Sequence, residues 1–336
     1  MLRSVILALA LAAPCQAALA NTRKTYEAKF FEHMQKFGLK FDSGDDFVKA
    51  LEAFAHNEDL INEHNAGNAT FTMGHNEYTH MTFEEFAAHF NLGKEMPIKK
   101  NGGPVFKAKL GAKVSDSVDW VSAGKVSPVK NQGQCGSCWS FSTTGSLEGA
   151  YSIGQDKDIS AWTGFSEQQL VSCDTTDSGC NGGLMDDAFA WIEGNGGLCS
   201  EDDYPYTSAE GIRGECKSSC TNVANSAPSK FTDVDSTEEA LMQAVDNGPV
   251  SVAIQANQIA FQSYSRGVLT GRCGTTLDHG VLAVGYGTWT DGTDYWKVKN
   301  SWGDSWGMDG YILIERGNSQ RGGECGILKM ASYPTI

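Results

Sequence analysis

The stretch Asn131-Gln132-Gly133-Gln134-Cys135-Gly136-Ser137-Cys138-Trp139-Ser140-Phe141 sets two cysteines three positions apart, after a polar run and before an apolar-aromatic run. Three interpretations of this pair compete. The first is a redox pair, because a Cys-x-x-Cys motif can lower the pKa of a thiol. The second is half of a zinc site, which requires a second pair of ligands at similar spacing. The third is a catalytic thiol at the start of a helix.

The number of cysteines favours a reactive thiol. Of the ten cysteines, Cys15 lies in the first twenty residues and nine follow, which is an odd number. In a secreted protein an unpaired thiol is either an intermolecular link or a reactive group. The redox interpretation weakens because eight other cysteines are available to pair, and the zinc interpretation weakens because Cys216 and Cys220 have no histidine nearby. Spacing alone does not give the pairing of the bridges.

Residues 1–20 have the features of a secretory signal peptide. Arg3 provides a charged start, residues 5–13 form a short apolar core, and a small-x-small cleavage site follows. The apolar run is too short to span a membrane, and no later stretch is long enough. We therefore expect entry into the secretory pathway, with a lysosome, a vacuole or the cell exterior as destination. The net charge of −15, without a cluster of Lys and Arg, argues against nucleic-acid binding.

Composition divides the remaining chain into two parts. Up to about residue 90 it shows helical apolar stripes and no cysteine, and Thr82 with Glu85 forms the capping box of a short helix. A Gly/Pro-containing linker around residues 101–116 follows. Beyond it, helical patterns precede strand patterns, which predicts an α+β fold with a cleft between the two halves. The expected strands are residues 250–254, 280–285, 295–299 and 310–315.

The second part offers the groups that a thiol hydrolase needs: a thiolate, a base, a group that orients the base, and donors for an oxyanion. Cys138 lies where a helix is expected to begin, so the helix dipole and free N–H groups would favour its thiolate. His279, at the head of a strand, is the only histidine after residue 90. Asn300 ends another strand pattern. Any reaction in this part that depends on histidine must therefore use His279.

On these residues the chain resembles a papain-family cysteine endopeptidase precursor of the cathepsin L-like branch. Cys-Gly-Ser-Cys-Trp is that family's signature around its nucleophile, with His and Asn about 130–150 residues downstream. The resemblance covers nearly the whole chain. The matching stretches are residues 132–141, 166–168, 180–183, 278–280, 300–303 and 325–326.

The resemblance implies a papain-like two-lobed fold, with a helical left lobe and a β-barrel-like right lobe on either side of a cleft. An inhibitory helical propeptide would precede it. The implied divisions are a signal peptide at 1–20, the propeptide at 21–113 and a peptidase domain at 114–336. Within the last, the helical lobe would span about 123–228, and the β lobe about 229–336 together with 114–122.

The same resemblance implies roles for five residues. Cys138 would be the nucleophile and His279 its ion-pair partner. Asn300 would orient the imidazole, and Trp302 would shield that hydrogen bond from water, which strengthens it. Gln132 would donate to the oxyanion together with the backbone N–H of Cys138. No cofactor and no metal is expected.

Substrate binding is also implied by the resemblance. Gly182 and Gly183 would offer backbone hydrogen bonds to an extended peptide. The pocket for the second residue before the scissile bond (P2) would be apolar, which predicts a preference for bulky apolar side chains and poor use of Arg. Its lining would be Leu184, Met185, Ala253, Leu277, Gly280 and Met330. We expect the size of Met330 to favour Leu or Val over Phe.

The family pattern implies the bridges Cys135–Cys180, Cys173–Cys216 and Cys273–Cys325. Elimination then leaves Cys199 with Cys220, although Cys216 and Cys220 are close enough in sequence to be exchanged.

In the implied propeptide, the motif Gly74-His75-Asn76-Glu77-Tyr78-Thr79-His80 has Tyr and His where the family usually has Phe and Asp. We hypothesise that His80 becomes charged as the pH falls through about 6.5 and contributes to acid-triggered release. A surface histidine without such a role is the alternative. Asn68 begins a glycosylation sequon.

The expected partners are protein or peptide substrates, the chain's own propeptide as an intramolecular inhibitor, and cystatin-like inhibitors, with the enzyme a monomer. Two other functions were weighed. A catalytically idle binding protein would usually lack the thiol or the histidine, and both are present here. An exopeptidase of the same fold would carry an insertion that blocks one end of the cleft, and the sequence shows none.

Overall fold

The computed structural model describes residues 19–98, 104–271 and 273–336. Nearly all of the expected signal peptide therefore lies outside the described residues. The part before residue 114, called the N-terminal region below, contains α1 (Arg23–Phe37), α2 (Gly44–Asn65), β1 (Phe71–Met73), α3 (Phe83–His89) and β2 (Val105–Phe106). None of the described helices is both long enough and apolar enough to cross a membrane.

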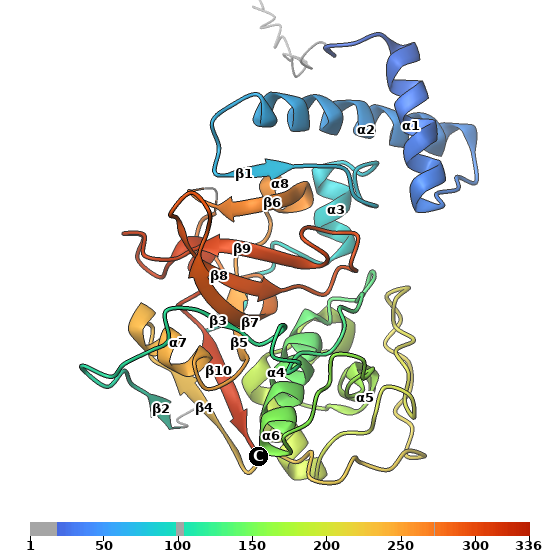
Figure 1. The fold of residues 1–336 in the computed structure, drawn as a ribbon. Helices are drawn as coiled ribbons and strands as arrows, with labels where there is room; N and C mark the ends of the chain where they lie inside the picture. Colours follow the sequence, from blue (N-terminus) through green and yellow to red (C-terminus); the bar gives the residue numbers. More distant parts are fainter. Residues whose placement is uncertain (1–18, 99–103, 272) are drawn as a thin grey trace, which may run out of the picture.

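The chain then forms a helical half followed by a β half. The helical half holds α4 (Cys138–Gly154), α5 (Glu167–Cys173), the 3-10 turn η1 (Gly179–Asn181) and α6 (Met185–Asn195). The β half holds β3 (Val118–Asp119), β4 (Lys230–Val234), α7 (Glu238–Val245), β5 (Val250–Ile254), α8 (Ile259–Gln262), β6 (Tyr264–Leu269), β7 (His279–Thr288), β8 (Asp294–Lys299), β9 (Tyr311–Glu315), η2 (Glu324–Gly326) and β10 (Ala331–Thr335). This order confirms the expected α+β arrangement (Figure 1).

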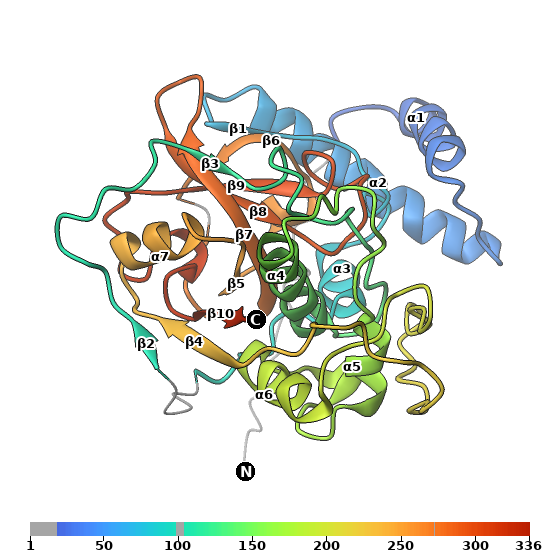
Figure 2. The same ribbon diagram turned by 60° about the horizontal axis from the view of Figure 1, so that its bottom comes forward.

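One sheet connects all ten described strands, in the order β1-β6-β9-β8-β7-β5-β10-β4-β2, with β3 paired to β7. Strand β7 lies in the middle of this order, and all of its residues except Thr288 are buried. Helix α4 lies between the sheet and the other helices of the helical half (Figure 2). The two halves therefore meet where α4 faces β5 and β7.

The sequence of α4 explains this close approach. Its Ser, Thr and Gly residues are small, and a Cβ atom on Gly145 would lie 2.8 Å from the side chain of Leu282. The hydroxyl group of Ser142 donates to the carbonyl of Val281 at 2.7 Å. The hydroxyl groups of Ser146 and Ser251 share a further hydrogen bond of 2.8 Å. A helix with this composition can be buried almost completely without leaving its polar groups unpaired.

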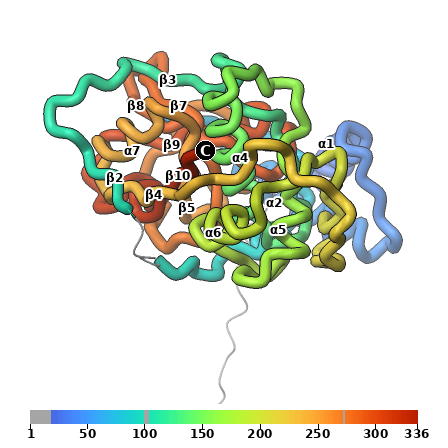
Figure 3. The backbone as a smooth tube through the Cα atoms, turned by 90° about the horizontal axis from the view of Figure 1, so that it is seen from below, coloured from blue at the N-terminus to red at the C-terminus, as the bar shows by residue number. Residues whose placement is uncertain are grey.

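The N-terminal region is mainly helical, as expected, and it also contributes two short strands that the sequence did not indicate. Helices α1 and α2 pack through Tyr26, Phe30 and Phe54, and α3 has the predicted capping box of Thr82 and Glu85. However, β1 pairs with β6, and β2 pairs with β4. These strands are too short to show an alternating pattern, and their hydrogen bonds come from a sheet formed elsewhere in the chain. Seen from below, α1 and β2 lie on opposite sides of the molecule (Figure 3).

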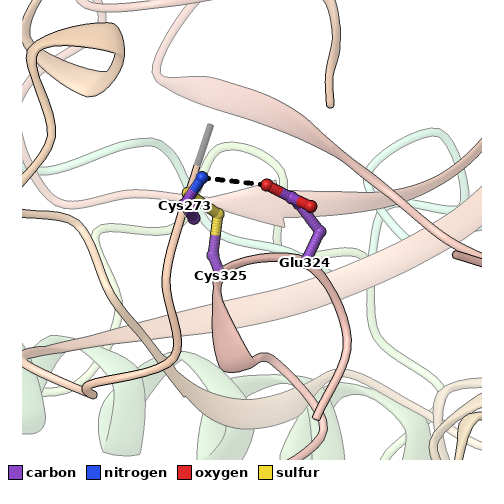
Figure 4. A group of neighbouring side chains, drawn as sticks. All are labelled: Cys273, Glu324 and Cys325. Carbon is purple, nitrogen blue, oxygen red and sulfur yellow. Dashed lines mark hydrogen bonds between the residues drawn. A yellow bond between two sulfur atoms is a disulfide. The ribbon is translucent and has the colours of Figure 1, made fainter. Parts of the chain in front are cut away.

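Four disulfides are formed, with the implied pairing: Cys135–Cys180, Cys173–Cys216, Cys199–Cys220 and Cys273–Cys325. The exchange of Cys216 and Cys220 is thereby excluded. Among the described residues Cys138 is the free cysteine. Glu324 lies beside Cys273 and Cys325 and accepts a hydrogen bond from the backbone N–H of Cys273 at 3.0 Å (Figure 4). Because the two sulfur atoms are bonded to each other, this cluster has no thiolate to offer a metal ion.

Candidate active site

Cys138, which carries the free thiol, is the first residue of α4. The side chain is buried, and its sulfur accepts the backbone N–H of Gly280, the second residue of β7, at 3.3 Å. Burial raises the pKa of Cys138 to about 11, against the opposing effect of this N–H. The thiol is therefore protonated in this form of the protein, although the helix start and Gly280 would stabilise a thiolate.

His279 begins β7, so its imidazole lies beside the residues that hold the thiol. Its Nε2 atom is 2.8 Å from Oδ1 of Asn300. That oxygen also accepts the backbone N–H of Ser301 at 2.8 Å, which fixes the orientation of the amide. Nε2 must therefore carry the hydrogen, and Nδ1 is the basic nitrogen. Nδ1 is buried without a hydrogen-bond partner, and burial lowers the pKa of His279 to about 4.

Trp302 covers the imidazole. The indole and imidazole rings stack with centroids 4.7 Å apart and planes inclined by 27°. Both side chains are fully buried. The hydrogen bond between His279 and Asn300 therefore lies in a dry environment, where such a bond is stronger than in water.

Gln132, six residues before Cys138, is fully buried. Its Oε1 accepts the hydroxyl group of Ser301 at 2.8 Å, and its Nε2 donates to the carbonyl of Cys135 at 2.9 Å. Nε2 has a second hydrogen, which this arrangement leaves available for an oxyanion. The Cys135–Cys180 disulfide fixes the carbonyl that holds the amide.

Most of the residues expected to line the P2 pocket belong to one apolar cluster. Leu184, Met185, Ala253 and Leu277 are buried in it, and Met330 packs against it. Gly280 keeps the pocket open, because a Cβ atom there would lie 3.2 Å from the sulfur of Met185.

The N-terminal region occupies the cleft. Met96 is buried in the apolar cluster that holds Leu184 and Leu277, and its backbone N–H donates to the carbonyl of Leu277 at 2.7 Å. The backbone N–H of Gly93 donates to Oδ2 of Asp278 at 2.9 Å. This segment covers the region of Cys138, and a cavity of about 260 Å³ remains between them. A peptide could not enter the cleft while the segment is in place.

Aromatic residues hold this segment against the site. Phe90 stacks on Trp302 with ring centroids 4.5 Å apart, and Phe86 packs edge-on against it at 5.2 Å. The hydroxyl group of Tyr78 donates to the backbone carbonyl of Trp302 at 2.9 Å. The tryptophan that shields the histidine is thus also the main anchor of the N-terminal region.

A cluster of histidines lies farther away, in the core between α1, α2 and the segment after β1. The ring of His33 is 5.8 Å from that of His75 and 6.3 Å from that of His80. His33 is buried with both ring nitrogens unpartnered, and Nδ1 of His80 is unpartnered too. Burial lowers the pKa of His80, so this residue gains its charge at a lower pH than the expected value of about 6.5.

Three positioning residues escaped the sequence analysis. Ser301 holds Gln132, Asp278 accepts the N–H groups of Ala256 and Gly93, and Glu58 pairs with His75 at 2.6 Å. Ser301 follows Asn300 in the sequence, and Asp278 precedes His279. Being next to a predicted catalytic residue was the one sign in the sequence that these two residues belong to the site. Glu58 has no such signal, because its partner is 17 residues away in the chain.

A buried thiol at a helix start, an imidazole oriented by an amide and a covered cleft define a thiol hydrolase held in an inactive form. Comparisons with known proteins agree. The papain family of cysteine proteases matches residues 114–335, and the cathepsin propeptide inhibitor domain (I29) matches residues 30–86. The chain belongs to the papain family: it is a cysteine endopeptidase in zymogen form, with its own propeptide inhibitor domain.

Relatives and solved structures resemble the chain along most of its length. The thiol protease SEN102 of Hemerocallis is 45% identical over 299 residues, which are 86% of this chain and 81% of that protein. Vignain of Ricinus communis is 45% identical over 85% of this chain and 79% of its own. A recombinant stem bromelain precursor has a TM-score of 0.84 at 35% identity, covering 93% of this chain and 99% of that one. Digestive procathepsin L 3 of Tenebrio molitor larval midgut has a TM-score of 0.80 at 36% identity, with the same coverage.

Proposed function

We propose that this zymogen, once its propeptide is removed, hydrolyses peptide bonds through an acyl-enzyme on Cys138. The observation that carries the proposal is the hydrogen bond between His279 and Asn300, because it leaves Nδ1 as the basic nitrogen. His279 directly precedes Gly280, whose backbone N–H donates to the sulfur of Cys138, the free thiol of the described chain, at 3.3 Å. Removing the propeptide admits water. The burial that keeps thiol and imidazole neutral then weakens, and the proton can pass from sulfur to Nδ1.

The reaction follows from these positions. The Cys138 thiolate attacks the scissile carbonyl, and the oxyanion accepts hydrogen bonds from Nε2 of Gln132 and the backbone N–H of Cys138. The imidazolium of His279 gives its proton to the leaving amine, which departs and leaves a thioester. His279 then takes a proton from water, whose oxygen attacks the thioester and releases the acid product with the thiol restored.

Specificity is proposed to reside in the apolar pocket that Met96 of the propeptide approaches. Its lining offers no charged partner, so an Arg side chain there would be buried without compensation. We expect a library of peptides that vary at P2 to show Leu and Val ahead of Phe, and Arg last. A profile led by Arg would contradict this part of the proposal.

Activation is proposed to occur at acidic pH. Burial, followed by the charges of His75 and His80, lowers the pKa of His33 to about 3. The unfolded propeptide therefore takes up a proton before the folded one does, and the folded form loses stability as the pH falls below about 6.5. His80, half-buried beside His33, acts in the same direction.

Four disulfides support a place in the secretory pathway, ending in a vacuole, a lysosome or the cell exterior. Asn68 is exposed in the loop between α2 and β1, where a glycan can attach. Protein substrates and cystatin-like inhibitors are the proposed partners of the open cleft, and the enzyme is proposed to act as a monomer.

The test is to express the zymogen and incubate it at about pH 5 with a thiol reductant. We expect the wild type to process itself, to hydrolyse a peptide with Leu at P2 and to be labelled by iodoacetamide at Cys138. Cys138→Ser should fold and lose at least about a thousandfold in hydrolysis, because the thiolate is gone. Full activity in Cys138→Ser, or an inactive wild type, would overturn the assignment.

A further inference from the structure

Two carboxyl groups that the proposed reaction does not use lie in one wall of the cleft. Asp177 follows α5, and its Oδ1 accepts the backbone N–H of Leu184 at 2.9 Å. Its carboxyl group also packs on the backbone of Gly183. A Cβ atom on Gly183 would lie 2.7 Å from Cγ of Asp177 and 2.6 Å from the indole of Trp139. The peptide of Gly183 is thus held between the carboxyl group and the tryptophan that follows Cys138.

The rest of this loop is fixed by its own hydrogen bonds. Oδ1 of Asp174 accepts the backbone N–H groups of Thr176 at 2.7 Å and Asp177 at 3.3 Å. The backbone N–H of Ser178 donates to the carbonyl of Gly182 at 2.9 Å. Asp177 is therefore the side chain that connects this loop to Leu184, the residue before α6, where the apolar pocket begins.

The outer oxygens of both aspartates indicate a shared proton. Oδ2 of Asp174 and Oδ2 of Asp177 are buried, and neither receives a donor from another described group. The two carboxyl groups are neighbours, because Oδ1 of Asp174 accepts the backbone N–H of Asp177 and the two side chains interact. Two carboxylates cannot bond to each other, because both only accept, so a proton on one of them is required. Carboxyl pairs in active sites hold a proton in this way.

The surroundings favour this proton up to neutral pH. Burial raises the pKa of Asp177 to about 8, against the N–H of Leu184, and the negative charges of Asp174 and Asp187 add to the increase. Asp187 faces the pair from α6. Lys94 and Glu95 of the propeptide line the same cavity and leave with the propeptide.

We propose that Asp177 is a positioning residue of the substrate cleft, fixing the Gly183–Leu184 peptide through a carboxyl group that shares a proton with Asp174. The inference rests on the proposed function, in which Gly183 pairs with the backbone of the substrate. Loss of the shared proton above neutral pH leaves two buried carboxylates side by side. Their repulsion displaces this wall and weakens substrate binding without affecting the thiol.

The test compares the processed wild type with Asp177→Asn and Asp177→Ala, measuring kcat and KM for an extended peptide from pH 5 to 8.5. Asn can accept from Leu184 and donate to Asp174, so it reproduces the protonated state at every pH. We expect its KM to stay flat, while that of the wild type increases several-fold above about pH 7.5. Asp177→Ala loses the bond to Leu184, and we expect KM to be about tenfold higher at pH 5 with kcat within about twofold.

Alkylation of Cys138 by iodoacetamide separates this claim from the proposed function, because that small reagent does not need the wall. Its rate should be the same in all three proteins. Asp156→Asn is the matched control, since Asp156 is exposed just beyond the far end of α4 from Cys138. The inference is wrong if Asp177→Asn keeps the wild-type KM profile, or if Asp177→Ala slows alkylation as much as it raises KM. A wild type that is neither alkylated nor active would instead refute the proposed function.

Discussion

The propeptide and the peptidase domain differ in most of the ionisable groups whose pKa values are shifted by burial. The propeptide buries His33 and partly buries His80 and His89, and burial lowers the pKa values of all three. The peptidase domain buries several acids, and burial raises the pKa of Asp186 to about 7 and that of Glu201 to about 8. It also buries two bases, His279 and Lys299, and burial lowers their pKa values to about 4 and about 8. A buried base disfavours the folded form as the pH falls, whereas a buried acid disfavours it as the pH rises.

The sign of each effect follows from the unfolded chain. Unfolded histidine takes up its proton near pH 6.5, so the propeptide loses stability from there downward, to about the pKa of 3 of His33. Unfolded carboxyl groups release their protons near pH 4, whereas the folded peptidase domain retains some of them up to pH 7 or 8. These buried carboxyl groups therefore make the peptidase domain less stable as the pH rises from 4 to 8. Under the proposed activation at acidic pH, we expect one acidification to loosen the inhibitor and to favour the enzyme.

The two regions also differ in covalent bonds. All four disulfides lie in the peptidase domain, and the described propeptide contains none. Replacing Cys199 and Cys220 by Ser opens a bridge with a sequence separation of 21 residues. We expect a loss of roughly 3 kcal/mol in the stability of the processed enzyme, measured by urea inactivation at pH 5.

The same double variant should leave the pH midpoint of zymogen activation where it is, because the bridge is not part of the propeptide. A shift of that midpoint would show that the two regions do not respond separately.

The contact between the regions is tested at Phe90, which stacks on Trp302. Phe90→Ala should cost about 2 kcal/mol of propeptide binding, since an aromatic anchor at the centre of an interface is lost. That corresponds to roughly thirtyfold faster alkylation of Cys138 in the intact zymogen at pH 7.

Phe31→Ala is the control for Phe90, because Phe31 is an exposed phenylalanine of α1. It should leave alkylation unchanged. Equal rates in Phe90→Ala and wild type would mean that Phe90 is not an anchor of the inhibitor.

The smallest effect is expected at His33, whose ring lies among Phe30, Phe37 and Phe54. His33→Phe retains an aromatic ring and removes the titration. We expect the activation midpoint to fall by about half a pH unit, because one of the buried bases no longer opposes folding in acid. The midpoint is read from processing on gels across pH 4 to 7.

His56→Gln provides the comparison for this shift, since His56 is an exposed histidine on α2. Its midpoint should match that of the wild type. If both variants shifted equally, burial of His33 would not be the cause.

Much of the site was predictable from the sequence because its residues lie next to regular elements. Cys138 begins α4 and His279 begins β7. Strand β7 has a clear apolar run, whereas α4 is rich in small polar residues and was expected from the motif around Cys138. The pairing of the bridges followed from the family resemblance, because residue spacing alone does not determine it.

The contacts between distant segments were not predictable. Strands β1 and β2 exist because strands far along the chain offer them hydrogen bonds. The histidine core depends on the folding of α1 against α2, and the burial of His80 depends on that packing. In the sequence, Asp177 looks like an ordinary loop residue. Its partner Leu184 becomes its neighbour only through the turn around Cys180.

Hydrogen exchange in the intact Cys138→Ser zymogen, which cannot process itself, tests the opposite pH responses most directly. Exchange is compared at pH 7 and pH 4.5 after correction for the intrinsic rates. We predict that α1 and α2 lose protection at pH 4.5, while β5, β7 and β8 keep theirs or gain. Loss of protection in the sheet before the propeptide helices, or unchanged protection in both, would contradict the account.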